Sequence, residues 1–307
     1  MPKISVIGAG NVGASAAMKI CQKRLGDVVL VDIAEGIPQG KALDIQQSLP
    51  LWGSDSRVTG TNDFSEIAGS DVVVIAAGVP RKPGMSREDL VGVNSGIIRS
   101  VCGEIKKHAP DSVVILVTNP LDYMAYLAYR ELGFPKERVM GMAGVLDSTR
   151  LRSFLAQELG VPASGIEAIV LGSHGDTMVP VIEHTRIGGR GLKEVLSEDR
   201  IKEIVKKTRD AGAEIVSHLK TGSAFYAPAA SIAEMAEAVL EDSGKVLPVS
   251  ALLEGEYGHT GLFLGVPARL GRTGIREIIE LELEEETRKS LDRSAEIIKE
   301  RLGTLSL

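Results

Sequence analysis

Short runs of apolar residues alternate with longer amphipathic segments along the first half of the chain. Runs that are almost wholly apolar and rich in Val and Ile predict strands covered on both sides. Segments whose apolar residues recur every three or four positions predict helices between them. The predicted strands are Ile4–Ile7, Val28–Val31, Val72–Ala77 and Val113–Val117, and the predicted helices are Val12–Arg24, Ile37–Leu49 and Glu88–His108. This alternation predicts a doubly wound parallel sheet (a Rossmann domain), which binds ligands at the carboxyl ends of its strands.

The pattern changes near Gly144, where we place the boundary between two domains, residues 1–143 and residues 144–307. A short strand at Val139–Ala143 closes the first series. Strands and helices then follow without regular alternation, which predicts an α+β domain. The predicted strands are Ile166–Leu171, Val179–Ile187, Val246–Leu253 and Leu262–Val266, the first two antiparallel, and the predicted helices are Leu146–Leu159, Asp199–Leu219, Ala227–Leu240 and the amphipathic Glu284–Arg301.

Composition narrows the classes of partner. With 44% apolar residues, 25% charged residues and two cysteines among 307, the chain is neither disordered, collagenous nor a disulfide scaffold. Its net charge of −6, with Lys and Arg dispersed, argues against nucleic acid. Its longest apolar runs are far shorter than the ~20 residues that span a bilayer, so we expect no membrane partner. Cys21 and Cys102 lie far apart without metal-ligand spacing, so we expect buried thiols, no metal and a cytoplasmic location.

A glycine-rich motif, Gly8–Gly13, follows the first predicted strand and opens the first helix. In such a GxGxxG turn, Gly8 permits the tight bend, Gly10 lets backbone approach a pyrophosphate, and Gly13 lets helix and strand pack closely. Asp32 ends the next strand, where it can accept hydrogen bonds from an adenine-ribose diol. Asp32 would repel a 2′-phosphate and residues 33–40 contain no Arg or Lys, so NAD is favoured over NADP. A purely structural turn is the alternative.

His174 lies between two glycines at the end of a predicted strand, in Gly172–Asp176. Asp147 and Arg150 are three residues apart and therefore share one face of a predicted helix. A carboxylate there can orient an imidazole and stabilise its protonated form, while a guanidinium can clamp a substrate carboxylate. The alternatives are a structural histidine and an ordinary salt bridge within the helix.

A cationic segment, Gly78–Arg87, follows the strand Val72–Ala77 at its carboxyl end. It contains Arg81, Lys82 and Arg87 together with two prolines and two glycines. Such a segment at the ligand edge of a parallel sheet is typical of a lid that brings positive charge onto an anion. A solvated surface loop is the alternative.

Six motifs occur in the order and spacing of one family: GAGNVG, VDI, GVPRKPGMSR, TNP, LDSTR and GSHGD. Together they resemble the lactate/malate dehydrogenase family over essentially the whole chain, and most closely the malate dehydrogenases of its lactate-dehydrogenase-like branch. The resemblance implies that His174, paired with Asp147, exchanges the proton, that Arg150 holds the C1 carboxylate, and that Arg87 polarises the reacting carbonyl. It also places Asn119 at substrate and nicotinamide, and the predicted cofactor-binding residues are Gly8, Gly10, Asn11, Val12, Gly13, Asp32, Asn94, Val117 and Asn119.

Arg81 stands where lactate enzymes of the family typically carry Gln and malate enzymes carry Arg. A second substrate carboxylate needs a countercharge, and at ~4 Å such a pair has a gross attraction of about 4 kcal/mol at an effective dielectric constant near 20. A methyl group would instead leave Arg81 desolvated and unpaired. Ala224 stands where lactate enzymes of the family often carry Thr. The smaller side chain of Ala leaves room for the longer diacid.

The resemblance therefore implies reversible NAD-dependent oxidation of (S)-malate to oxaloacetate, a reaction of the tricarboxylic acid cycle. Two alternatives stay open: a lactate or broad 2-hydroxyacid dehydrogenase, and a non-catalytic NAD-binding protein. The second is disfavoured because a sensor has no need of the proton-transfer pair. The family is commonly dimeric or tetrameric, so we expect a homo-oligomer.

Overall fold

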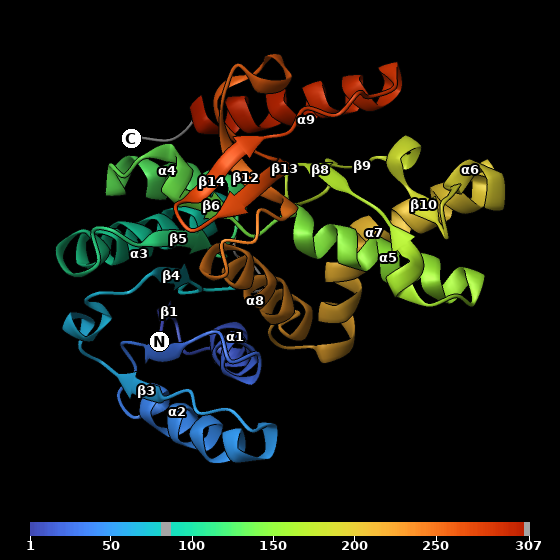
Figure 1. Ribbon diagram of the computed structural model, residues 1–307. Helices are drawn as coiled ribbons and strands as arrows, with labels where there is room; N and C mark the ends of the chain where they lie inside the picture. Colours follow the sequence, from blue (N-terminus) through green and yellow to red (C-terminus); the bar gives the residue numbers. More distant parts are fainter. Residues whose placement is uncertain (81–86, 304–307) are drawn as a thin grey trace. The chain divides into compact units, whose positions relative to one another are not determined.

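The computed structural model describes residues 1–80 and 87–303, which fall into two compact units (Figure 1). The first unit draws on residues 1–142, 224–246 and 269–277, and the second on residues 143–223, 247–268 and the chain from 278 onward. Each unit is therefore assembled from segments that are far apart in the sequence. The division of function at Gly144 stays a prediction.

A parallel sheet forms the centre of the first unit (Figure 1, blue to green). Every neighbouring pair in it is parallel, and residues stay in simple register, as in Ile4 opposite Val28 and Val72. The strands lie in the order β3 (Val58–Thr61), β2 (Asp27–Val31), β1 (Lys3–Ile7), β4 (Val72–Ile75), β5 (Val113–Leu116) and β6 (Val139–Gly141). This order, with β1 at the point where the winding reverses, confirms the predicted Rossmann sheet.

Helices connect these strands and pack on the sheet: α1 (Asn11–Gln22), α2 (Ile37–Ser48), α3 (Arg87–His108) and α4 (Leu121–Leu132). A fifth helix of the unit, α8 (Tyr226–Leu240), comes from far along the chain and packs against α1, β4 and β5. α1 buries Gly13, Ala16 and Ala17 beside Ile20, and such small side chains let helices approach closely. Both cysteines are free and buried, and burial raises the pKa of each thiol to about 12.

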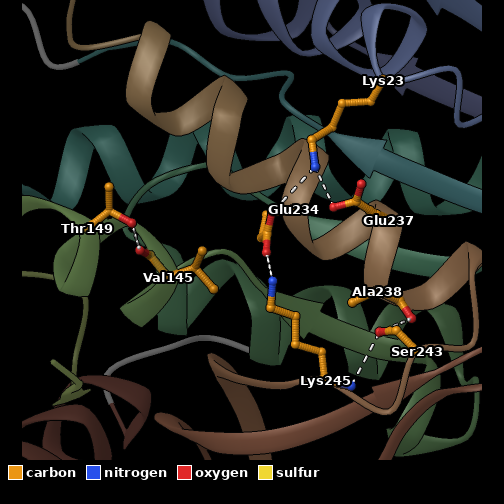
Figure 2. Close-up of polar contacts among 8 residues, drawn as sticks. All are labelled: Lys23, Val145, Thr149, Glu234, Glu237, Ala238, Ser243 and Lys245. Atoms are coloured by element: carbon orange, nitrogen blue, oxygen red, sulfur yellow. Dashed lines mark hydrogen bonds and ion pairs between the residues drawn. The ribbon is translucent and has the colours of Figure 1, made fainter. Parts of the chain in front are cut away.

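Figure 2 shows a network of charges that joins α1 to α8. The Lys23 ammonium at the end of α1 pairs with Glu237 and lies 3.5 Å from Glu234 on α8. Glu234 also binds Lys245, in the segment that follows α8. Burial raises the pKa of Glu234, but the hydrogen bonds and charges of Lys245 and Lys23 outweigh it and hold the pKa below its ordinary 4.5. The network therefore links the distant segment 224–246 to the end of α1, in addition to the buried face of α8.

The second unit contains short antiparallel pairings rather than a parallel sheet. β8 (Val170–Gly172) pairs antiparallel with β9 (Met178–Pro180) and with β13 (Thr260–Gly271), and β12 (Val246–Glu254) lies next to β13. A separate three-stranded sheet consists of β11 (Arg190–Gly191), β10 (Arg186–Ile187) and β7 (Ile166–Glu167). β14 (Gly274–Ile278) pairs with β13, and the last residues of β13 belong with most of β14 to the first unit. The helices are α5 (Gly144–Leu159), α6 (Leu192–Val195), α7 (Glu198–Leu219) and α9 (Glu285–Gly303). The predicted α+β architecture is confirmed.

Two predicted strands of this unit are wrong in their extent. The run Ile166–Leu171 divides into β7 and β8, which belong to different sheets. The run Val179–Ile187 stops at Pro180, which has no N–H to donate, and passes through a 3-10 turn at Ile182–His184 before β10. Apolar periodicity reports burial and does not report which strand is the partner. Within the described residues, no helix is long and apolar enough to cross a membrane.

The charge network predicts a pH-dependent contribution to stability. Because the folded-state pKa of Glu234 is depressed, its contribution is full above the unfolded-state pKa and is lost as pH falls through the folded-state pKa. Glu234→Gln should lower the free energy of unfolding by about 0.5–1 kcal/mol at pH 7, and less at pH 3. Urea unfolding at both pH values measures this. Exposed Glu296 on α9 gives a matched control, and a Glu296→Gln loss equal to that of Glu234→Gln would contradict the role of the network.

Candidate active site

The glycine-rich turn leaves β1 and enters α1 with no room for side chains at two of its glycines. Gly8 has φ +105°, and a Cβ there would lie 2.6 Å from the backbone nitrogen of Ala77. A Cβ on Gly13 would lie 1.8 Å from the carbonyl oxygen of Gly8. Gly10 is exposed and has open space where its Cβ would be. The turn is therefore compressed against the sheet but open at Gly10, where the amino end of α1 can receive a pyrophosphate.

Asp32 lies at the carboxyl end of β2, beside this turn. Its Oδ2 accepts a hydrogen bond from the backbone N–H of Ala9 at 2.6 Å, and its Oδ1 accepts one from Ala34 at 2.9 Å. The carboxylate is half-buried, so lone pairs remain for a ribose diol. Lys41 on α2 donates to the carbonyl oxygen of Ala9 at 2.6 Å. Lys41 was not predicted from the sequence, because it lies one position beyond the segment 33–40, which contains no basic residue.

The ends of β4 and β5 are joined by the buried amide of Asn94 on α3. Its Oδ1 accepts from the Val79 N–H at 2.9 Å, and its Nδ2 donates to the carbonyl oxygen of Asn119 at 2.7 Å. The Asn119 side chain is exposed, and Val117 at the end of β5 is half-buried. The predicted cofactor residues of the first unit therefore gather at the carboxyl ends of β1, β2, β4 and β5. Asn94 holds backbone there, and direct contact with cofactor stays a prediction for all of them.

The second unit brings together His174, Asp147 and Arg150, as the sequence predicts. Asp147 is 1% exposed on α5, and its Oδ2 lies 2.8 Å from His174 Nδ1. Among the described residues its Oδ1 has no hydrogen-bond partner, and it lies 3.5 Å from a terminal nitrogen of Arg150. In the same helical turns, Thr149 bonds back to the carbonyl oxygen of Val145 at 2.8 Å (Figure 2). One buried carboxylate thus serves an imidazole and a guanidinium at once.

Arg150 is held in a sheltered position against α7. Only 13% of its side chain is exposed, and a Cβ on Gly212 of α7 would lie 3.7 Å from the guanidinium. Burial lowers the pKa of Arg150, while the negative charge of Asp147 opposes that change. A guanidinium keeps its proton in proteins even so. Arg150 is therefore a partly desolvated cation that suits a carboxylate ligand.

The structure describes only part of the cationic segment Gly78–Arg87. Arg81 and the side chain of Arg87, the first residue of α3, lie outside the described residues, as does Lys82. Within the described residues, no group of three or more His, Cys, Asp and Glu side chains could hold a metal ion. Two other histidines make contacts away from this cluster: His259 binds Asp292 at 2.8 Å, and His184 binds the carbonyl oxygen of Glu282 at 2.8 Å.

Comparison with known proteins gives the family. The model of the "lactate/malate dehydrogenase, NAD binding domain" matches residues 2–141, and that of the "lactate/malate dehydrogenase, alpha/beta C-terminal domain" matches residues 144–305. The chain belongs to the lactate/malate dehydrogenase family. NAD is therefore confirmed as the cofactor, and the chain is an NAD-dependent oxidoreductase of this family.

The chain resembles both malate dehydrogenases and a lactate dehydrogenase. The malate dehydrogenase of Methanosarcina mazei is 52% identical over 307 residues, which are 100% of each protein. The crystal structure of Cryptosporidium parvum malate dehydrogenase matches with a TM-score of 0.96 and 46% identity, covering 99% of each chain. The lactate dehydrogenase of that organism, complexed with lactic acid and NAD, matches with a TM-score of 0.95 and 44% identity, covering 99% of this chain and 98% of its own. Overall likeness to solved structures thus leaves the choice of substrate to particular residues.

Proposed function

We propose that this protein catalyses the reversible NAD-dependent oxidation of (S)-malate to oxaloacetate. The observation that carries the proposal is the buried Asp147 carboxylate, which lies 2.8 Å from the His174 imidazole and 3.5 Å from Arg150. An imidazole paired with a carboxylate exchanges a proton, and a sheltered guanidinium beside it binds a carboxylate. Oxidation of a 2-hydroxy acid needs both a proton acceptor and a binding group for the substrate carboxylate.

NAD, when bound, would accept the hydride from C2, and the turn at Gly8–Gly13 together with Asp32 would hold it. Arg150 binds the C1 carboxylate of malate and fixes C2 beside His174. As hydride leaves C2, neutral His174 takes the hydroxyl proton at Nε2, and the C2–O bond becomes the ketone. Asp147 stabilises the imidazolium that forms, and Arg87 polarises the carbonyl oxygen. In the reverse direction, the imidazolium returns the proton to that oxygen.

Arg81 and the malate dehydrogenase relatives support malate rather than lactate. Malate has a second carboxylate where lactate has a methyl group, and Arg81 supplies the matching charge. The relatives include the Methanosarcina mazei malate dehydrogenase, which is 52% identical over the whole length of both chains. A lactate dehydrogenase is the second candidate, because one of 44% identity has nearly the same fold.

The proposal has three further parts. Residues 1–143 bind NAD, and residues 144–307 carry the proton-transfer pair and Arg150. The enzyme works in the cytoplasm, in keeping with its two free, buried cysteines. It is a dimer or tetramer of identical chains, and the exposed apolar side chains of Leu43, Leu51 and Trp52 support such self-association.

The proposal predicts which substrate pair is used. NADH oxidation followed by absorbance should be fast with oxaloacetate, slow with pyruvate, and slow with NADPH in place of NADH. Preference for pyruvate would favour the lactate dehydrogenase reading and overturn the role of Arg81. Absence of turnover with both acids, in protein that binds NADH, would favour a non-catalytic NAD-binding protein.

Arg81→Gln should shift the preference toward pyruvate. Loss of a charge pair with the second carboxylate costs ~2–5 kcal/mol, so the ratio of kcat/KM for oxaloacetate to that for pyruvate should fall by about 30-fold or more. Steady-state kinetics with both acids measures the ratio. Lys82→Gln removes a neighbouring charge as the control. An equal fall in both variants would assign the preference to the net charge of the segment instead of Arg81.

A further inference from the structure

The carboxyl-terminal helix α9 packs against β8 and β9, the two strands that flank the His174 turn. Its buried face consists of Leu291, Ser294, Ala295 and Ile298. Ser294 is the one polar residue in that set, and it is 0% exposed. A buried hydroxyl must find hydrogen-bond partners in its surroundings.

The partners of Ser294 belong to the turn that carries His174. The Ser173 backbone N–H donates to Ser294 Oγ at 2.9 Å. Ser294 Oγ also lies 3.2 Å from Thr177 Oγ1, which lies 2.6 Å from Ser173 Oγ. Residues 173 and 177 are therefore joined to each other and to a helix 121 residues further along the chain. His174 projects from the peptide that follows the bonded one.

The approach of α9 to this turn is close. Gly172 has φ +81°, and a Cβ there would lie 3.0 Å from Ser294 Oγ and 3.0 Å from the carbonyl oxygen of Thr177. Within the turn, the Gly175 N–H donates to the Ser173 carbonyl oxygen at 2.9 Å. Both the N–H and the carbonyl oxygen of Ser173 are therefore held by hydrogen bonds.

The helix that provides Ser294 is itself held in register. Asp292 Oδ1 accepts from His259 Nε2 at 2.8 Å, and Arg288 donates to the carbonyl oxygen of Tyr257 at 2.6 Å. Tyr257 is buried, and its hydroxyl donates to the carbonyl oxygen of Ile279 at 2.9 Å. These contacts hold α9 against the turn between β12 and β13. One of the contacting residues, Asp292, lies two positions before Ser294.

We propose that Ser294 is a positioning residue for His174. By accepting a hydrogen bond from the Ser173 N–H, Ser294 fixes the position of the backbone from which the His174 side chain extends. Asp147 then fixes the orientation of the imidazole ring. Ser294 acts through the backbone and does not touch substrate. The inference rests on the proposed function, in which His174 exchanges the proton.

The effect belongs to the chemical step because proton transfer is sensitive to placement. A misplacement of ~1 Å can cost ~100-fold in rate, so a loosened turn should cost about tenfold. A hydroxyl that only satisfied a buried amide would affect stability and leave the rate and pH profile of the folded enzyme unchanged.

Three variants of the full-length protein test this. Ser294→Ala removes the acceptor, and Ser294→Cys keeps the shape while providing a weaker one. Ser290→Ala is the matched control on the same helix, because Ser290 is exposed and bonds back to the Glu286 carbonyl oxygen of its own helix at 2.9 Å. The readouts are kcat and KM for oxaloacetate, the pH profile of kcat, the isotope effect with 4-deuterated NADH, the NADH Kd and the melting temperature.

Ser294→Ala should lower kcat about tenfold, raise the isotope effect and move the pH profile, with the NADH Kd unchanged. Ser294→Cys should fall between it and the wild type, and Ser290→Ala should match the wild type. A Ser294→Ala enzyme that melts earlier but keeps its kcat, isotope effect and pH profile would overturn the proposal. If Ser294→Ala does not fold, Ser294→Cys decides by the same criteria.

A second readout separates this inference from the proposed function. In protein labelled with ¹⁵N-histidine, the Nδ1–H resonance of His174 reports the ring's bond to Asp147 without any substrate. It should move or broaden in Ser294→Ala and stay in place in Ser290→Ala, and an unchanged resonance in both would contradict the positioning role. Wild-type protein that turns over neither oxaloacetate nor pyruvate would contradict the proposed function while leaving this result interpretable.

Discussion

The buried charge of Asp147 is the constraint on which the candidate site depends. An ionised carboxylate removed from water costs several kcal/mol unless it is paired and hydrogen-bonded. Asp147 is 1% exposed, and its two oxygens face His174 and Arg150. The imidazole and the guanidinium that face this charge are the groups proposed to exchange the proton and to bind the substrate carboxylate. Substrate chemistry and the electrostatics of the fold are coupled through one side chain.

Secondary structure places these three groups with little freedom. Asp147 and Arg150 are one turn apart on α5, whose helical geometry fixes their separation. His174 comes from a turn held by glycine at 172 and by Ser294 of α9. In the first unit, the Gly8–Gly13 turn is fixed in a similar way, because backbone occupies the places where side chains would be. Close packing around Gly8, Gly13 and Gly172 thus limits the conformational freedom of each turn.

The sequence predicted well whatever depends on local spacing. Most of the parallel strands contain mainly apolar runs, whereas β3 (Val58–Thr61), with Thr or Gly at three of its four positions, was not predicted. Gly8–Gly13 with Asp32 form a motif whose geometry follows from residue type. The link between His174 and Asp147 was also predictable, once a family resemblance supplied the pairing across 27 residues. Pairing partners were not predictable from periodicity, so the runs beginning at Ile166 and Val179 were each assigned to one strand.

Polar contacts made across long separations left no signal in the pattern. Ser294 lies on an amphipathic helix, where a serine among Leu291, Ala295 and Ile298 is indistinguishable from an ordinary small core residue. The charges of Glu234 and Lys245 likewise read as solvated until α8 is placed against α1. The segment 224–246 joins the first unit although it follows most of the second in sequence. Such assignments depend on tertiary contacts that one sequence does not encode locally.

The most direct measurement is the pH dependence of kcat/KM for oxaloacetate reduction in wild-type and Asp147→Asn enzyme, with Asp199→Asn, an exposed carboxylate of α7, as the charge-matched control. The wild-type rate should fall with rising pH as His174 loses its proton. Without the Asp147 charge the imidazolium is less stable, so the fall should move about one to two pH units lower, while Asp199→Asn follows the wild type. A wild-type profile that is flat, or identical profiles in wild type and Asp147→Asn, would contradict the account.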